Sequence, residues 1–244
     1  MFKSMTFNNQ RKSNFTLLRG RQKAPFFPLE RDIVKYAGGY RLKKTDRGLL
    51  EISQPIGYIV REDKNYPDFK DEYALSLRDE LTSWLITDDW VDLQFDDEPG
   101  RTYRAIVQNT IEDFEKFEEV RHGTVQFIAH EVLGSTHNLS ITSSYQTFDI
   151  KGQINTPWTS YTRFKIDTDQ YILENNVGGK IVLNFNFIEG DVLEIDYRKR
   201  KITLNGNNLA VALSLDSHWF ELKPGAILLQ SSNETTMTYT ERYS

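Results

Sequence analysis

The sequence contains no cysteine and only four histidines in its 244 residues. The absence of cysteine excludes disulfide bonds, thiolate nucleophiles and cysteine-ligated zinc. The histidines are His122, His130, His137 and His218. They are too sparse for a metal-binding set, and the segment that begins at His130 lacks the second histidine of the zinc-protease motif. We therefore expect neither a metal ion nor a cofactor.

Long apolar runs are also missing. No stretch approaches the roughly 18–20 apolar residues that a helix needs to cross a bilayer. The chain begins MFKSMTFNNQRK, which is polar and basic where a secretion signal would carry about 7–15 apolar residues. The sequence thus predicts no membrane insertion and no signal peptide.

The common catalytic motifs are absent as well. The sequence has no nucleophile elbow, phosphate loop or dinucleotide fingerprint, and the triplet Gly178-Gly179-Lys180 lacks the upstream glycine of a phosphate loop. The acidic run at 96–98 lacks the spaced loop with a central glycine that binds calcium, so we interpret it as a solvated turn. Carboxylate pairs that meet only in space are invisible in one sequence. With that reservation, the sequence favours a protein that is not an enzyme.

What the chain does have is enough apolar surface for real cores. Hydrophobic residues make up 39% of it, with 15 Phe, 12 Tyr and 4 Trp, which opposes the entropy lost on ordering the backbone. Its length favours two domains over a single large sandwich.

Charge is distributed unevenly along the chain. Residues 1–50 contain 12 Lys and Arg against 3 Asp and Glu, a net charge of +9, whereas residues 51–150 carry −13 and residues 151–244 carry −1. The basic segment could bind nucleic acid, or it could lie against the acidic region of its own subunit or of a neighbour. We favour protein contact, because the segment lacks the interleaved aromatic residues of single-strand binders.

The first half reads as short strands with one helix. Two prolines end the first 25 or so residues, which we predict to be an extended, loop-like arm. Apolar clusters predict strands at 49–53, 56–60, 90–95, 103–107 and 125–129. Between them, Leu77, Leu81, Trp84 and Leu85 recur at three- and four-residue spacing, which predicts one amphipathic helix near 70–86.

The second half is dense in strands. Alternation places Ile181, Leu183, Phe185 and Phe187 on one face of a strand, and Asn205-Gly206 is typical of a tight type I′ hairpin turn. Further strands are expected at 193–197, 202–204, 209–213 and 226–229. We predict an antiparallel β-sandwich, with domains at 1–134 and 135–244.

Several segments, in this order, resemble the distal tail protein (Dit) family of siphophages and prophages. In the second half they are GDVLEID at 190–196, ITLNG at 202–206 and WFELKPG at 219–225. In the first half they are FNN at 7–9, LLRG at 17–20, the glycine pair at 38–39, EL at 80–81, WL at 84–85, FDDEPGRTY at 95–103 and GTVQF at 123–127. Together they span most of the chain.

The resemblance implies a structural role in a virion. Members form homo-hexameric rings that join the tail tube to the tail-tip hub, so the expected location is the tail tip, after synthesis in the bacterial cytoplasm. The implied fold is a β-rich, ring-forming N-terminal domain with one helix, followed by a galectin-like or carbohydrate-module-like sandwich. The outer sandwich would contact a receptor-binding protein or a host-surface glycan.

Charge suggests where subunits meet in such a ring. The basic residues Arg11, Lys12, Arg19 and Arg21 could lie on the acidic region of the next subunit. Alternatively, Asp88, Asp89 and Asp92 could line the channel and keep passing DNA from adhering to the wall, without specific nucleic-acid binding.

Aromatic residues suggest a second kind of contact. Trp158 and Tyr161 could stack on sugar rings if they are exposed on one sheet face, and the alternative is that they pack in the core. A stand-alone carbohydrate-binding sandwich is therefore the alternative function to a tail hub.

Overall fold

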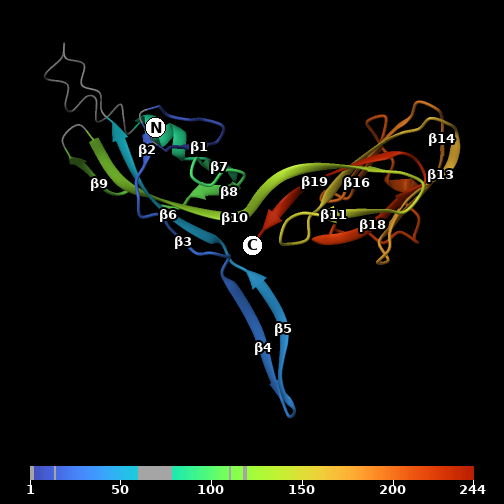
Figure 1. Ribbon diagram of the computed structural model, residues 1–244, viewed down its shortest axis with the longest axis horizontal. Helices are drawn as coiled ribbons and strands as arrows, with labels where there is room; N and C mark the ends of the chain where they lie inside the picture. The colour runs from blue at the N-terminus through green and yellow to red at the C-terminus, as the bar shows by residue number, and fades with distance from the viewer. Residues whose placement is uncertain (1–2, 14, 60–78, 110, 118–119) are drawn as a thin grey trace. The chain divides into compact units, whose positions relative to one another are not determined.

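The computed structural model describes residues 3–13, 15–59, 79–109, 111–117 and 120–244. The chain divides into two compact units, unit 1 at Met1–Leu133 and unit 2 at Gly134–Tyr243. Strands dominate both units (Figure 1). This confirms the predicted mainly β fold. Within the described residues there is one α-helix, at 79–85, and the first part of the predicted helix, 70–78, lies outside them.

Unit 1 is built on an antiparallel sheet around one long strand. Its strands are β1 (Met5–Phe7), β2 (Phe15–Leu17), β3 (Gln22–Lys23), β4 (Leu29–Tyr36), β5 (Gly39–Arg47), β6 (Leu50–Ile59), β7 (Val91–Phe95), β8 (Thr102–Val107), β9 (Glu112–Phe117) and the first part of β10 (Val120–Ile141). The sheet order is β1-β7-β8-β10, and β10 also pairs with β6 and β9. In turn, β6 pairs with β2 and β3.

The N-terminal segment is part of this sheet, so the prediction of a loop-like arm is wrong. Strand β1 pairs with β7, and β2 and β3 pair with β6. Met5, Phe7 and Phe15 are buried. The ring of Phe7 lies 5.5 Å from that of Phe127, and the backbone oxygen of Phe7 accepts a hydrogen bond from the Trp84 indole. Segments from both ends of unit 1 therefore share one core.

Strands β4 and β5 form a separate two-stranded sheet (Figure 1). They are joined by a turn at Ala37-Gly38, and Tyr36 pairs with Gly39. Every residue of β4 is exposed, as is every residue of β5 except Gly39. At the base of the hairpin the backbone N–H of Gly48 donates to the Pro28 oxygen at 2.8 Å. The two ends of the hairpin are thus held together by a backbone hydrogen bond.

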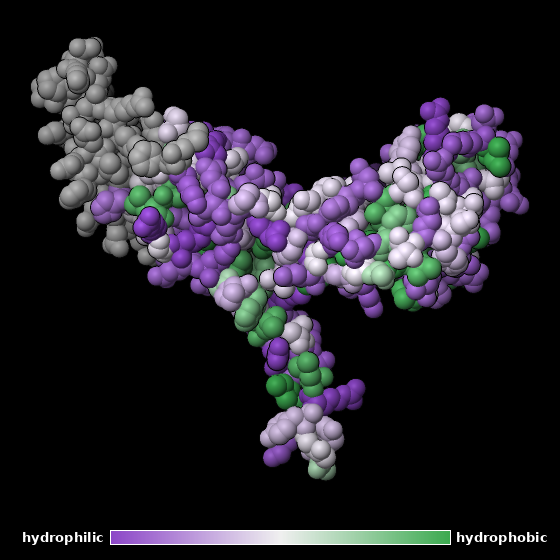
Figure 2. All heavy atoms as spheres, viewed as in Figure 1, coloured by the Kyte–Doolittle hydropathy of each residue, from purple (hydrophilic) through white to green (hydrophobic). Residues whose placement is uncertain are grey.

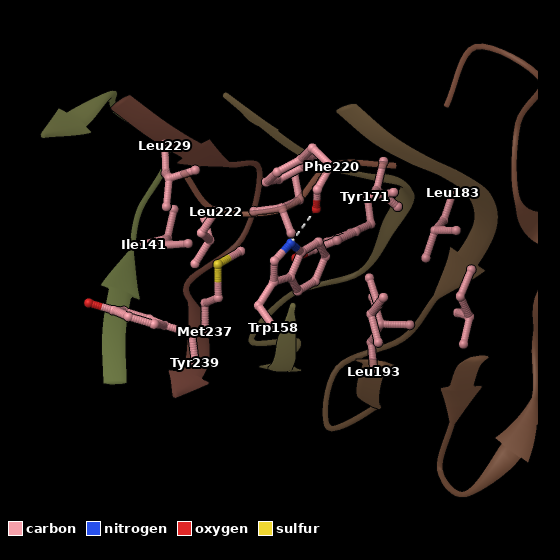
Figure 3. Packing of buried hydrophobic residues seen from close by; sticks show 14 of the residues in the cluster. Ile141, Trp158, Tyr171, Leu183, Leu193, Phe220, Leu222, Leu229, Met237 and Tyr239 are labelled. Carbon is pink, nitrogen blue, oxygen red and sulfur yellow. Dashed lines mark hydrogen bonds between the residues drawn. The ribbon is translucent and has the colours of Figure 1, made fainter. Parts of the chain in front are cut away.

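Unit 2 is an antiparallel sandwich of two sheets. Its elements are the last part of β10, β11 (Gln146–Ile150), β12 (Trp158–Arg163), β13 (Thr168–Asn175), β14 (Lys180–Phe187), β15 (Val192–Asp196), β16 (Lys201–Leu204), β17 (Asn207–Asn208), the 3-10 turn η1 (Ala210–Ala212), β18 (Gly225–Ser231) and β19 (Thr235–Tyr243). One sheet has the order β10-β19-β12-β15-β16-β17 and the other β11-β18-β13-β14. Buried side chains from both sheets form a single cluster between them (Figure 3).

Local predictions in unit 2 were partly right. Asn205 and Gly206 have φ of 50° and 81°, as a type I′ turn requires. The strand predicted at 209–213 is instead the 3-10 turn η1, and Val211 there is 95% exposed. Phe185 is also exposed, because the burial alternation breaks within β14, where its pairing with β13 shifts register.

Candidate interaction surfaces

The acidic turn that follows β7 receives the basic N-terminal segment of the same chain. Two guanidinium nitrogens of Arg11 donate to the two carboxylate oxygens of Asp96, at 2.7 and 2.6 Å. The backbone N–H of Ser4 donates to the same carboxylate at 2.8 Å. A two-pronged arginine–carboxylate pair of this kind fixes orientation as well as charge.

Arg21 makes the most enclosed contact of this turn. Its guanidinium donates to Glu98 at 2.7 Å and to Asp97 at 2.8 Å, and it lies 3.8 Å from the centre of the Phe95 ring. Only 12% of its side chain is exposed. Lys23 adds a second ion pair to Glu98 at 2.6 Å. Arg11, Arg21 and Lys23 thus all bind the turn at 96–98.

Three of the four basic residues predicted at a subunit contact make ion pairs within their own chain. Arg11 and Arg21 pair with the acidic turn, and Lys12 pairs with Glu80 at 3.1 Å, all within one chain. These pairs support the alternative that the basic segment lies against its own subunit, and contact of Arg11, Lys12 and Arg21 with a neighbouring subunit stays a prediction. Arg19 makes no ion pair within the described part of the chain, and its role at a subunit contact stays a prediction.

The three aspartates predicted to line a channel lie on and before β7. Asp92 pairs with Arg104 at 3.2 Å. Asp88 and Asp89 are exposed just after the helix, and the Asp89 carboxylate accepts the backbone N–H of Trp90 at 2.8 Å. Exposed Ile86 precedes them. This makes an acidic surface with one apolar side chain, and the channel role stays a prediction.

The ion pairs shift the acidity of the turn. The hydrogen bond from Arg11 is the main cause that lowers the pKa of Asp96. Burial would raise the pKa of Glu98, but hydrogen bonds from Lys23, Tyr103 and Arg21 outweigh it, so that pKa is lowered. Burial raises the pKa of Tyr103, which donates its hydroxyl to Glu98. Both carboxylates are thus stabilised in their charged form.

These shifts predict an acid-sensitive unit 1. A carboxyl group whose pKa is lower in the folded chain adds stability above its unfolded pKa, about 4, and loses it as pH falls through the folded pKa. We expect Arg11→Met to reduce the loss of stability between pH 6 and pH 3, because Asp96 then titrates nearer its unfolded value. Urea unfolding at several pH values, with hydrogen exchange as the probe of unit 1, measures how the free energy of unfolding of unit 1 depends on pH. Arg19→Met is the matched control and should leave the pH dependence unchanged; equal curves for Arg11→Met and wild type would contradict the role of the pair.

The β4–β5 hairpin has two chemically different faces. Cross-strand partners share a face, and Ile33 pairs with Leu42 and Lys35 with Tyr40. What we call the apolar-basic face contains Leu29, Arg31, Ile33, Lys35, Tyr40, Leu42, Thr45 and Arg47. The mixed face contains Glu30, Asp32, Val34, Tyr36, Arg41, Lys44 and Asp46. All three acidic residues of the hairpin therefore lie on one side.

The structure separates the two aromatic residues predicted to contact sugar. Trp158 is 2% exposed, and its indole N–H donates to the backbone oxygen of Phe220 at 2.8 Å (Figure 3). It therefore cannot stack on a ligand, which corrects that prediction. Tyr161, three residues along the same strand, is 45% exposed on the opposite face.

Tyr161 lines an open hollow of about 330 Å³ on the outer face of the sheet. Register places it between Thr236 of β19 and Glu194 of β15. The remaining lining is polar and charged: Thr159, Ser160, Asp196, Lys199, Lys201, Thr203 and Thr238, with Ile195. An aromatic ring surrounded by carboxylates and hydroxyls can stack on a sugar ring and bind its hydroxyl groups.

The described residues contain no group of three or more His, Cys, Asp or Glu side chains placed to hold a metal ion. No helix among them has the length and apolar content to cross a membrane.

Comparisons with known proteins agree across both units. The family model described as the siphovirus-type tail component, C-terminal domain, matches residues 151–243. The distal tail protein of Bacillus phage SPP1 is 29% identical over 182 residues, which are 70% of this chain and 71% of that protein.

Solved structures share the fold. The crystal structure of the SPP1 Dit protein, described as a paradigm of the hub adsorption apparatus in phages that infect Gram-positive bacteria, superimposes with a TM-score of 0.84 at 20% identity and covers 100% of both chains. A chain of the phage P2 baseplate in its activated conformation gives 0.51 at 9% identity, over 99% of this chain and 98% of that one.

Proposed function

Since this chain belongs to the distal tail protein family of phages and prophages, we propose that six copies of it form a ring that joins the tail tube to the tail-tip apparatus. The structural role in the distal tail rests on the sequence match to the SPP1 distal tail protein across most of the chain. That match is the observation that carries the proposal. The hexamer, the tail tube partner and the tail-tip hub partner go beyond it.

Each unit supports one part of this role. Unit 1 would be the ring-forming domain. Ion pairs hold its N-terminal basic segment within the chain. Its β4–β5 hairpin is exposed and is available for contact with another subunit. Unit 2 would be a galectin-like outer sandwich with a free sheet face around Tyr161. Neither part of the role requires catalysis by this chain.

Immunogold electron microscopy of virions tests the proposal. Antibodies raised against the chain are expected to label the tail end distal to the capsid. Particles that lack the protein should lose the tail-tip apparatus while keeping a tail tube. Labelling of capsids, or tails that assemble normally without the protein, would overturn the proposal.

A second function is favoured by the hollow at Tyr161. We infer that this sheet face binds a host-surface glycan, because an exposed aromatic ring stands there beside Glu194 and Asp196. The ring would supply stacking and the carboxylates would accept hydrogen bonds from sugar hydroxyls. A stand-alone sugar-binding protein would use the same face but would form no ring. Ring formation therefore distinguishes a tail hub from a stand-alone sugar-binding protein.

Replacing Tyr161 is expected to weaken this binding without unfolding unit 2. Tyr161→Ala should lower affinity for purified host cell-wall polysaccharide about tenfold, from the loss of roughly 1.4 kcal/mol of stacking and burial. Isothermal titration calorimetry measures it. Tyr145→Ala removes another exposed tyrosine of the same unit, 48% exposed, and should leave affinity unchanged. No polysaccharide binding by the wild type, or equal loss in both variants, would count against the site.

A further inference from the structure

The apolar-basic face of the β4–β5 hairpin leaves large side chains in solvent. Tyr40 is 72% exposed, Ile33 56% and Leu42 55%, and the three lie on one face (Figure 2 shows apolar residues on the hairpin). A two-stranded hairpin without a packed face is at best marginally stable in water. Exposed apolar groups gathered on such an element are typical of a contact surface.

Charge on the same face is uncompensated. Arg31, Lys35 and Arg47 make no ion pair within the described residues, and their face contains no acidic side chain. On the mixed face, by contrast, Lys44 pairs with Asp46 at 2.7 Å, and Asp32 of that face lies 3.5 Å from Lys43, the residue at the register shift. Two of the three acidic residues of the hairpin are therefore paired within it, and three cations are left beside an apolar surface. Such a face fits a partner surface that is acidic and partly apolar.

The chain itself supplies that chemistry. Residues 29–47 contain six Lys and Arg against three Asp and Glu, a net charge of +3, so the remaining 24 basic and 32 acidic residues carry −8. One acidic and partly apolar surface is Ile86 with Asp88 and Asp89. The basic residues 11–23, in contrast, are largely occupied within their own chain.

We propose that the apolar-basic face of the hairpin docks on an acidic, partly apolar surface of a second copy of this chain. The inference rests on the proposed ring and specifies which surface closes it. Ile33 and Leu42 would be buried at the contact, with Arg31, Lys35 and Arg47 around them. The mixed face, where Tyr36 lies over Gly38 of its own turn, would remain in solvent.

Variants on the two faces of the hairpin test the proposal. Ile33→Ser with Leu42→Ser should raise the dissociation constant of the full-length assembly at least about 100-fold, since two aliphatic side chains lose their burial. Val34→Ser with Tyr36→Ser, on the mixed face of the same hairpin, is the matched control and should leave assembly intact. Native mass spectrometry and sedimentation over a range of concentrations measure both. Hydrogen exchange should also slow in the hairpin of the assembled wild type and remain fast in the Ile33→Ser, Leu42→Ser variant.

The outcomes separate this inference from the proposed function. Assembly unaffected by the Ile33→Ser, Leu42→Ser pair, or lost equally in both pairs, overturns the docking face. A wild-type chain that stays monomeric at all concentrations also overturns it. If such a chain still labels the distal tail end of virions, the structural role in the tail stands while the hairpin contact falls.

Discussion

Deletion of residues 1–24 is expected to unfold unit 1, and not merely to prevent its assembly. The deletion removes β1, β2 and β3 with the buried side chains of Met5, Phe7 and Phe15. Burying each such side chain contributes roughly 1.5–3 kcal/mol, so their sum is comparable with the whole stability of a domain, about 5–15 kcal/mol. The ion pairs of Arg11 and Arg21 with the turn at 96–98 are lost as well.

Hydrogen exchange followed by mass spectrometry measures this unit by unit. In the deletion variant, amides of β7 and β8 should exchange as in an unfolded chain, while those of β12 and β15 in unit 2 keep their protection. The matched control removes a similar length from the same region: residues 29–47 are replaced by two glycines. Pro28 and Gly48 are already hydrogen-bonded at 2.8 Å, so this chain should retain the protection of β7 and β8. Retained protection after deletion of 1–24 would show that the segment is dispensable for the fold.

The N-terminal strands escaped prediction for a physical reason. They are two or three residues long, and each is held by pairing with β6 or β7, which lie about 30 to 90 positions away in the sequence. Sequences this short show no alternation that distinguishes a strand from an extended loop. The longer strands β7 and β8 were recognisable because their own alternation is sustained.

The hairpin was missed although the sequence carried a signal for it. Gly38-Gly39 stands between Ile33-Val34 and Leu42, and a glycine pair between apolar segments is a hairpin signal. No structure was predicted for residues 29–47, because charged residues interrupt the apolar ones and neither face of the hairpin is apolar throughout. Its two faces become distinct only once the register pairs Ile33 with Leu42.

Trp158 shows a different limit of sequence reading. Buried and exposed residues alternate along β12, so Trp158, Ser160 and Thr162 point inward and Tyr161 outward. Two of the three inward residues, Ser160 and Thr162, are polar. The sequence of β12 therefore shows no alternation of apolar and polar residues from which its buried face could be predicted. Thr162 is satisfied inside by a 2.7 Å hydrogen bond with Thr235, a partner 73 positions away. Long-range pairing of that kind decides burial and is not visible along the chain.

Trp158→Ala is accordingly expected to destabilise unit 2 by about 3–5 kcal/mol, the usual cost of removing a large buried aromatic side chain. The indole packs on Phe220 with ring centres 5.3 Å apart and on Tyr197 at 6.0 Å, and its N–H satisfies the Phe220 oxygen at 2.8 Å. The substitution leaves both a cavity and an unpaired buried carbonyl group. Urea unfolding, with hydrogen exchange to identify unit 2, gives the change in the free energy of unfolding.

Two further variants separate the contributions. Trp158→Phe keeps most of the packing and loses the hydrogen bond, so its cost should be smaller than that of alanine. Trp219→Ala removes a partly buried tryptophan whose ring lies 4.7 Å from the Arg200 guanidinium, and should cost about 1 kcal/mol. A change below 1 kcal/mol for Trp158→Ala would contradict its place in the core. Because Trp158 is 2% exposed, it cannot contact a glycan directly. Any loss of glycan binding by Trp158→Ala should therefore be proportional to the fraction of unfolded protein, and binding should return under conditions that stabilise the fold. A loss in Tyr161→Ala, in contrast, must persist in fully folded protein.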